Sequence, residues 1–365
     1  MPVVLMNRAQ WTFVGVLAAA ALAILAFMTF LAMHGEDPQI AYDARLEVLA
    51  ERAVEAGADG VNAIAFSPDG RTLASAGADG VARLWDADTG LDVGALEHPG
   101  PVLALAFSPD GRTLVTGDRD GGARRWRLED RSLTAVLRGH DGGVDAVAAS
   151  PDGRWLATGG EDGVVRIWRT ADGAAAATLR SHGRRVDAHA FSPDGLLLAS
   201  GSLDGDVKLW RLKDATLVRT IPAAGQAVAA LAFFPDGGSL ATGGDDATVR
   251  RFAVADGAPM GAAHGGAEPV YAIAASPDGR WLAAGGRDRT ALGSAARALL
   301  GARRAPGRGK NVRVWRASDG KLGAILSANR DDVRGVAFSP DGRRLATASA
   351  DGRIVLWSFG EREGL

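Results

Sequence analysis

Histidine is the residue type in this chain whose placement first suggests a metal site. The chain contains six histidines, and three of them, His98, His140 and His182, lie 42 residues apart. Regular spacing over such distances places the three in equivalent positions of a repeat rather than around one ion. The chain has no cysteine, which removes disulfides, thiolate zinc sites and cysteine nucleophiles.

Aspartate is the other candidate for chemistry. Asp86, Asp88 and Asp92 are spaced as in part of a calcium-binding loop, but the further ligands and the terminal glutamate of such a loop are missing. A turn between two strands is the favoured alternative. The sequence shows no Ser/His/Asp set, glycine-rich phosphate loop or zinc spacing, so we expect no enzyme, no cofactor and no metal.

The overall charge bears on the kind of partner that the protein can bind. The 365 residues carry a formal net charge of −2 and have an isoelectric point near 6.3. Nothing in this balance favours nucleic acid as a partner.

The amino terminus reads as a membrane segment. Residues 11–33 carry no charge and would span roughly 34 Å as a helix, enough for a bilayer core of about 30 Å. A cleaved signal peptide or a buried soluble helix is the alternative. By the positive-inside rule, Arg8 favours a cytoplasmic location for the tail 1–10 and an extracytoplasmic one for the residues after 33. Reversed insertion, which would place the residues after 33 in the cytoplasm, is the alternative. Residues 34–44 form a short polar linker.

The rest of the chain is a repeat. Pro-Asp-Gly occurs seven times, and the residues before these strings are spaced by 41, 42, 42, 42, 42 and 63. A period near 42 is typical of a solenoid, propeller or array. Each period contains short apolar runs separated by turn residues, which predicts four short antiparallel strands per unit and a radial all-β arrangement of seven units.

The sequence resembles the WD-repeat β-propeller family. A tryptophan ends the third strand in six units, and an aspartate stands in the second turn of every unit: Asp79, Asp120, Asp162, Asp204, Asp246, Asp288 and Asp351. Phe252 replaces the tryptophan in the fifth unit. The resemblance covers residues 45–365 and implies a seven-bladed propeller.

The resemblance also implies an internal hydrogen-bond chain in each unit, from a loop histidine through a strand hydroxyl to the turn aspartate and the tryptophan. Three units carry every member. These are His98, Thr116, Asp120, Trp126; His140, Thr158, Asp162, Trp168; and His182, Ser200, Asp204, Trp210. The first and seventh units lack the histidine.

Closure of the ring needs a strand from before the first unit, because too few residues follow Trp357. Residues 45–50 are the candidate for this closing strand. A short helix over 41–56 is the alternative.

Propellers of the family often bind partners on the face where the first strands begin. Position by position, this face would present an acidic half and a basic half, and the residues expected there are Asn62, Arg119, Asp145, Glu161, Asp187, Asp245, Tyr271, Arg287 and Arg334. Ordinary mixed surface charge is the alternative.

An insertion at 290–309 in the sixth unit is basic and could form an amphipathic segment. Leu299, Leu300, Arg303 and Arg304 are its candidate contacts with lipid or a partner. A mobile loop is the alternative.

We therefore expect a non-catalytic, membrane-anchored scaffold for protein partners, in contact with the bilayer through 11–33 and facing the extracytoplasmic side. It could be an accessory subunit of a membrane complex. A propeller that senses a small molecule, or an enzyme that uses the centre of the ring, is the alternative.

Overall fold

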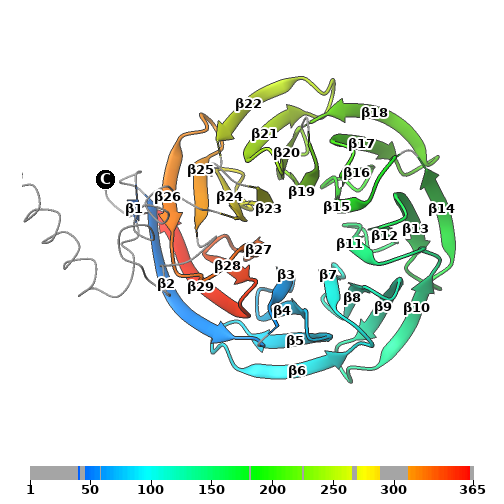
Figure 1. Cartoon of the computed structure of the whole chain (residues 1–365), viewed down its shortest axis with the longest axis horizontal. Coiled ribbons are helices and arrows are strands. Elements are labelled where there is room, and N and C mark those ends of the chain that lie inside the picture. The colour runs from blue at the N-terminus through cyan, green and yellow to red at the C-terminus, as the bar shows by residue number, and fades with distance from the viewer. Residues whose placement is uncertain are drawn as a thin grey trace, which may run out of the picture. The chain divides into compact units, whose positions relative to one another are not determined.

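The strands form a closed ring of seven radial sheets. In a computed structural model of the chain, the described residues are 40–41, 46–57, 59–180, 182–223, 226–264, 269–287 and 311–361. Over these residues every sheet is antiparallel, and the innermost strands surround the centre of the ring (Figure 1). The expected seven-bladed propeller with four-stranded blades is confirmed.

Each blade runs outward from its innermost strand in chain order. Blade 1 contains β3 (Val61–Phe66), β4 (Thr72–Gly77), β5 (Val81–Asp86) and β6 (Asp92–Glu97); blade 2 contains β7 (Val102–Phe107), β8 (Thr113–Asp118), β9 (Gly122–Arg127) and β10 (Leu133–Arg138); blade 3 contains β11 (Val144–Ala149), β12 (Trp155–Gly160), β13 (Val164–Arg169) and β14 (Ala175–Arg180). Blade 4 contains β15 (Val186–Phe191), β16 (Leu197–Ser202), β17 (Asp206–Arg211) and β18 (Thr216–Pro222); blade 5 contains β19 (Val228–Phe233), β20 (Ser239–Gly244), β21 (Thr248–Ala253) and β22 (Pro259–His264).

The last two blades recruit strands from the amino-terminal side. Blade 6 contains β23 (Val270–Ala275), β24 (Trp281–Gly286), β25 (Val312–Arg316), β26 (Leu322–Leu326) and a fifth strand, β1 (Ile40–Ala41); blade 7 contains β27 (Val333–Phe338), β28 (Arg344–Ser349), β29 (Arg353–Glu361) and β2 (Leu46–Glu55).

The Pro-Asp-Gly strings close the hairpins between the first and second strands. In blade 1 the Ser67 hydroxyl donates to Asp69 at 2.5 Å and accepts from the Thr72 amide at 2.9 Å. Gly70 adopts a φ of 72°, a conformation that costs glycine little. A hydrogen bond from the serine to the aspartate recurs in every blade except blade 5, where Phe234 replaces the serine.

The core is divided among the gaps between neighbouring blades. Trp126 of blade 2 packs with Leu84 and Leu96 of blade 1, so each tryptophan seals the gap to the preceding blade. The ring is therefore stabilised by contacts around its whole circumference, and it depends on closure at blade 7.

Closure is made by β2, which pairs with β29 from Leu46↔Glu361 to Glu55↔Arg353. The strand is longer than the 45–50 expected, and no helix forms over the described part of 41–56. Leu46 is 1% exposed and packs with Trp281 and Phe359, so β2 also joins blade 7 to blade 6. Ahead of it, β1 pairs with the outer edge of β26 through Ile40↔Ile325.

Two expectations from the sequence fall outside the described residues. They are residues 1–39, which include the segment 11–33, and the insertion 290–309 with Leu299, Leu300, Arg303 and Arg304. Residues 40–41 of the expected linker are described and form β1. In the described part of the chain, no helix is long and apolar enough to cross a membrane.

Candidate partner-binding face

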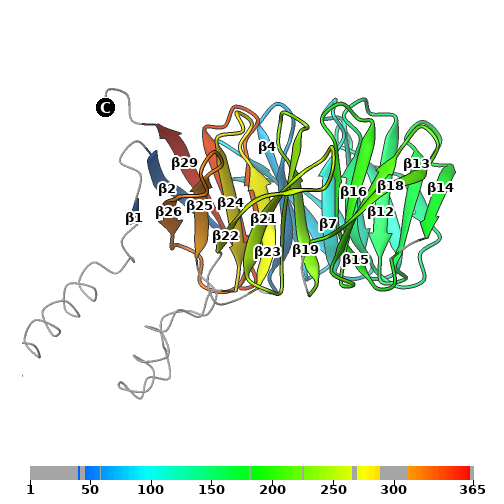
Figure 2. The same ribbon diagram turned by 90° about the horizontal axis from the view of Figure 1, so that it is seen from above.

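One face of the ring collects the starts of the innermost strands. Val61 at the start of β3 pairs with Gly77 at the end of β4, so the turn at 78–80 lies beside the start of the innermost strand. The same pairing recurs around the ring, and the strands run between two rims of loops (Figure 2). We call this side the first-strand face. The nine residues expected on it all occupy these starts and turns.

The acidic sector of the first-strand face lies at blades 3 and 4. Arg185 Nε lies 2.5 Å from an oxygen of Asp187 and 3.9 Å from an oxygen of Asp145. Burial raises the pKa of Asp145 to about 7, assisted by the charges of Asp187 and Glu161. Burial also raises the pKa of Asp187. These carboxyls are held close together with a single arginine between them, so a cationic group placed here would relieve their repulsion.

The other sector lies at blades 6, 7 and 1. Arg334 donates to Asn62 Oδ1 at 2.8 Å, and Asn62 Nδ2 donates to the Val102 carbonyl at 2.8 Å. Arg287 Nε lies 3.2 Å from an oxygen of Asp332, and its guanidinium lies 6.0 Å from the centre of the Tyr271 ring. Asn62 is thus a support for Arg334.

The expected division into an acidic and a basic half is less complete than the sequence suggested. Arg185 lies inside the acidic sector, and Asp332 lies inside the basic one. The sequence pattern did not reveal Arg185 and Asp332, because each directly precedes an innermost strand and lies outside the strand and turn positions that defined the expected face. Arg119, Glu161 and Asp245 are exposed at the turns and extend the two sectors outward.

The hydrogen-bond chains lie within the blades. In blade 3, His140 Nδ1 is 3.0 Å from Asp162, its Nε2 is 2.7 Å from the Thr158 hydroxyl, and Trp168 donates to that hydroxyl at 2.8 Å. Blade 4 repeats this with His182, Asp204, Ser200 and Trp210 at 3.0, 2.7 and 2.9 Å. Burial lowers the pKa of both histidines, so they are neutral members of the structure.

Blade 2 departs from the expected chain. His98 contacts the Thr116 hydroxyl at 2.7 Å, and Trp126 donates to it at 3.0 Å, but His98 Nδ1 faces the Leu96 carbonyl at 2.9 Å. Asp120 instead pairs with Arg124 at 2.9 Å. Arg124 also contacts buried Asp118.

Two structural roles were missed. Asn329 occupies the histidine position of blade 7, 3.2 Å from the Thr347 hydroxyl, which accepts from Trp357 at 3.1 Å. The signal was its position 18 residues before the hydroxyl, the separation of His98 from Thr116. A basic residue two positions before the tryptophan also pairs with the turn aspartate, as Arg83 does with Asp79 at 2.6 Å.

The segment that resembled a calcium loop is a turn. Asp86 Oδ1 accepts from the amides of Asp88 and Thr89 and from the Thr89 hydroxyl at 3.1, 2.7 and 2.7 Å. Its oxygen is thereby used in closing the connection from β5 to β6. Within the described residues, no group of three or more histidine, aspartate or glutamate side chains is arranged to hold a metal ion.

Comparison with known proteins gives one assignment. A family model described as "WD domain, G-beta repeat" matches residues 52–86, 92–127, 131–169, 173–211, 215–252, 259–292 and 320–358, well over half of the chain. No curated protein matches the chain. Each matched segment is offset from a blade. It begins with β2 or with the outermost strand of one blade and continues with the inner strands of the next blade. Together with the seven closed blades, the match shows that the chain belongs to the WD domain, G-beta repeat family.

Proposed function

We propose that this chain is a membrane-anchored, non-catalytic platform that binds a protein partner on its first-strand face, outside the cytoplasm. WD-repeat propellers generally mediate protein–protein interactions and generally act as scaffolds without catalysis. The observation that carries the proposal is the placement of charge around the centre of this face. Asp145 and Asp187 lie in one sector, and Arg287 and Arg334 lie in the other.

This arrangement suits orientation of a partner. The partner would place a cationic group near Asp145 and Asp187, where two carboxyls share Arg185. It would place a carboxylate near Arg334, whose exposed side chain is positioned by Asn62. Complementary charges at two separate places fix the rotation of the partner on the disc and suppress wrong partners.

The anchor is the second part of the proposal. The uncharged run 11–33 is long enough to span a bilayer, and a basic residue precedes it. At most about 25 Å of extended chain separates residue 33 from Ile40, which is already paired with blade 6. An uncleaved anchor would therefore hold the rim of blade 6 near the membrane, as suits an accessory subunit of a membrane complex.

Affinity isolation in mild detergent followed by mass spectrometry tests the binding face. The variant Asp145→Ala, Asp187→Ala, Arg334→Ala should lose the partner recovered by the wild type. A matched control is Glu129→Ala, Asp256→Ala, Lys213→Ala, which removes two acids and one base from exposed turns of the opposite face. Recovery that is equal for wild type and the first variant would contradict the proposed face.

The anchor and its orientation are tested separately. We expect the chain to resist carbonate extraction, to retain its amino terminus by intact mass, and to be digested by protease added from the extracytoplasmic side. Loss of the first 33 residues would indicate a cleaved signal peptide, and protection from the protease would indicate reversed insertion.

A further inference from the structure

A groove between blades 5 and 6 marks a departure from the repeat. In blades 1–4 and 6, the outermost strand places a large aliphatic side chain opposite one particular residue of the third strand. That third-strand residue stands three positions before the aromatic residue that ends the strand. These side chains are Leu96, Leu137, Leu179, Ile221 and Leu326, and all are buried. Each packs in the same cluster as the aromatic residue of the next blade.

Blade 5 has alanine at this register. Ala263 pairs with Val249, as Ile221 pairs with Val207 in blade 4. Alanine has three fewer side-chain carbons than leucine. At this register alanine is too short to occupy the gap beside Trp315, the aromatic residue of the next blade, as leucine or isoleucine does in the other blades.

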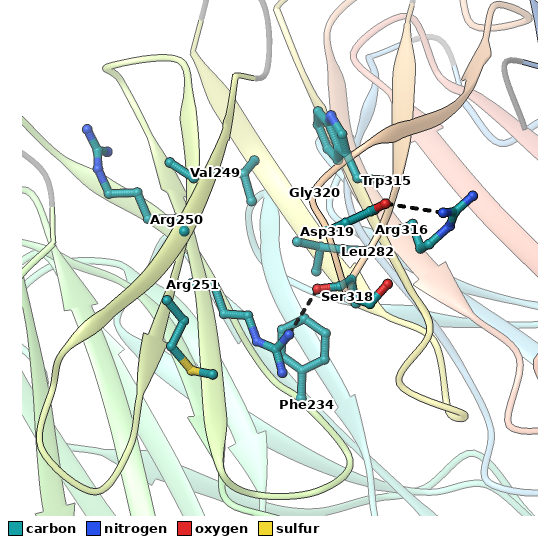
Figure 3. A pocket seen from close by; sticks show the side chains of 14 residues that line it. Phe234, Val249, Arg250, Arg251, Leu282, Trp315, Arg316, Ser318, Asp319 and Gly320 are labelled. Carbon is teal, nitrogen blue, oxygen red and sulfur yellow. Dashed lines mark hydrogen bonds and ion pairs between the residues drawn. The ribbon is translucent and has the colours of Figure 1, made fainter.

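A cavity of about 240 Å³ lies at this place. Its floor is apolar and is formed by the buried side chains of Phe234, Val249, Leu282 and Trp315 (Figure 3). Met260 lines it and is 54% exposed, which places a flexible apolar side chain at the opening. A Cβ at Gly261 would meet no atom within 4 Å, in keeping with open space beside β22.

The charges around the cavity are balanced. Three arginines line it, and each has a carboxylate partner: Arg250 with Asp246 at 2.5 Å, Arg251 with Asp236 at 3.9 Å and Arg316 with Asp319 at 3.2 Å. Arg251 is also held over the Phe234 ring at 4.1 Å, with Nη1 donating to the Ala317 carbonyl at 3.0 Å. This apolar floor with a neutralised rim favours an uncharged apolar group over an anion or a cation.

The edge beside the groove can accept a strand. β22 is the outermost strand of its sheet, so one row of its backbone groups faces outward. In the neighbouring blade, β1 pairs with the equivalent edge of β26 through Ile40↔Ile325. The ring itself thus shows that an extended segment with an aliphatic residue can add to this kind of edge.

We propose that the groove between blades 5 and 6 is a second interaction site, which takes an extended, uncharged segment of a partner protein with one leucine or isoleucine side chain inserted beside Trp315. The partner's side chain would pack beside Trp315 as Leu326 and its equivalents pack beside the aromatic residue of the next blade in the rest of the ring. The site lies on the rim of the ring and is independent of the first-strand face.

The test uses the full chain in lipid nanodiscs with ¹³C-labelled methionine methyl groups. Met260 is the only one of the five methionines beyond residue 33, so its signal reports on the groove. The probe is the peptide acetyl-Thr-Thr-Leu-Thr-Thr-amide, and its match has serine in place of leucine. Because burial of one leucine side chain contributes about 1.5–3 kcal/mol, we expect the leucine peptide to bind about ten- to hundred-fold more tightly.

Two variants make the result specific. Ala263→Leu fills the groove as Leu179 does in blade 3, and it should weaken binding of the leucine peptide at least ten-fold. Ala176→Leu adds the same side chain at an exposed position of β14 and should leave binding unchanged. Equal shifts with the leucine and serine peptides, or wild-type binding by Ala263→Leu, would overturn the proposal.

Deletion of 289–310 distinguishes another occupant. Binding that is unchanged by the deletion supports an external partner segment. Binding seen only after the deletion would show that the chain fills its own groove, and the proposal would fall.

Discussion

Replacement of His189 by leucine should stabilise the protein. His189 stands at the fourth position of β15, and the other six innermost strands carry aliphatic residues there: Ile64, Leu105, Val147, Leu231, Ile273 and Val336. The His189 ring faces Gly159 of blade 3, where a Cβ would collide with its Nε2. Among the described residues, neither buried ring nitrogen makes a hydrogen bond of normal geometry.

The expected gain depends on pH. Burial lowers the pKa of His189 from 6.5 to about 3, although the backbone of Thr158 and Ala199 opposes the shift. Because the folded pKa lies below the unfolded one, protonation opposes folding, and stability is lost as pH falls through 6.5. An unpaired buried polar group costs about 1–3 kcal/mol, which sets the gain at pH 7. At pH 5, protonation of the unfolded state adds about 2 kcal/mol to the gain.

Guanidinium unfolding of the wild type and of His189→Leu measures the gain in stability at pH 7 and the additional gain at pH 5. The matched control is His140→Leu, which removes the partner of Asp162 and the Thr158 hydroxyl and should destabilise blade 3. If His189→Leu lowers the free energy of unfolding, or if its gain is the same at both pH values, the reasoning about the unpaired imidazole is refuted.

Three further predictions concern the face, the blades and the closure. Asp145→Asn should raise the free energy of unfolding at pH 8 but not at pH 4. The folded pKa of Asp145, about 7, lies above its unfolded value, so the stability of the wild type falls as pH rises between the two values. Equal pH profiles of stability for the variant and the wild type, from denaturant titrations, would count against this. Thr158→Val should cost about 2–4 kcal/mol in chemical denaturation, since it leaves Trp168 Nε1 and His140 Nε2 without their hydroxyl partner, and a loss under about 0.5 kcal/mol would contradict it. Leu46→Ala should cost about 2–5 kcal/mol and speed hydrogen exchange in β29, whereas unchanged exchange there would show that β2 does not hold the closure.

The repeat made the blades predictable because its markers are local. The Pro-Asp-Gly hairpins and the third-strand tryptophans are read within one period, and a period of 42 residues leaves room for four short strands. The need for a closing strand also followed from the short tail after Trp357. The pairing of β1 with β26 did not, because two residues give no strand pattern of their own.

The details of the site depended on contacts between positions that the repeat does not align. Asp120 pairs with Arg124 while His98 faces the Leu96 carbonyl, and Arg185 enters the acidic sector; strand spacing specifies neither arrangement. Asn329 could have been found by its separation from Thr347. The groove beside Trp315 also had a sequence signal, the alanine at 263, but its meaning needed the register of β21 with β22.

We propose that a protein partner binds the first-strand face. Photocrosslinking tests this binding, with p-benzoylphenylalanine placed in the full chain at Arg119 on that face or at Lys213 on the opposite face. We expect an adduct with the isolated partner from position 119 and little from position 213. Adducts of equal yield from both positions, or from position 213 alone, would contradict it.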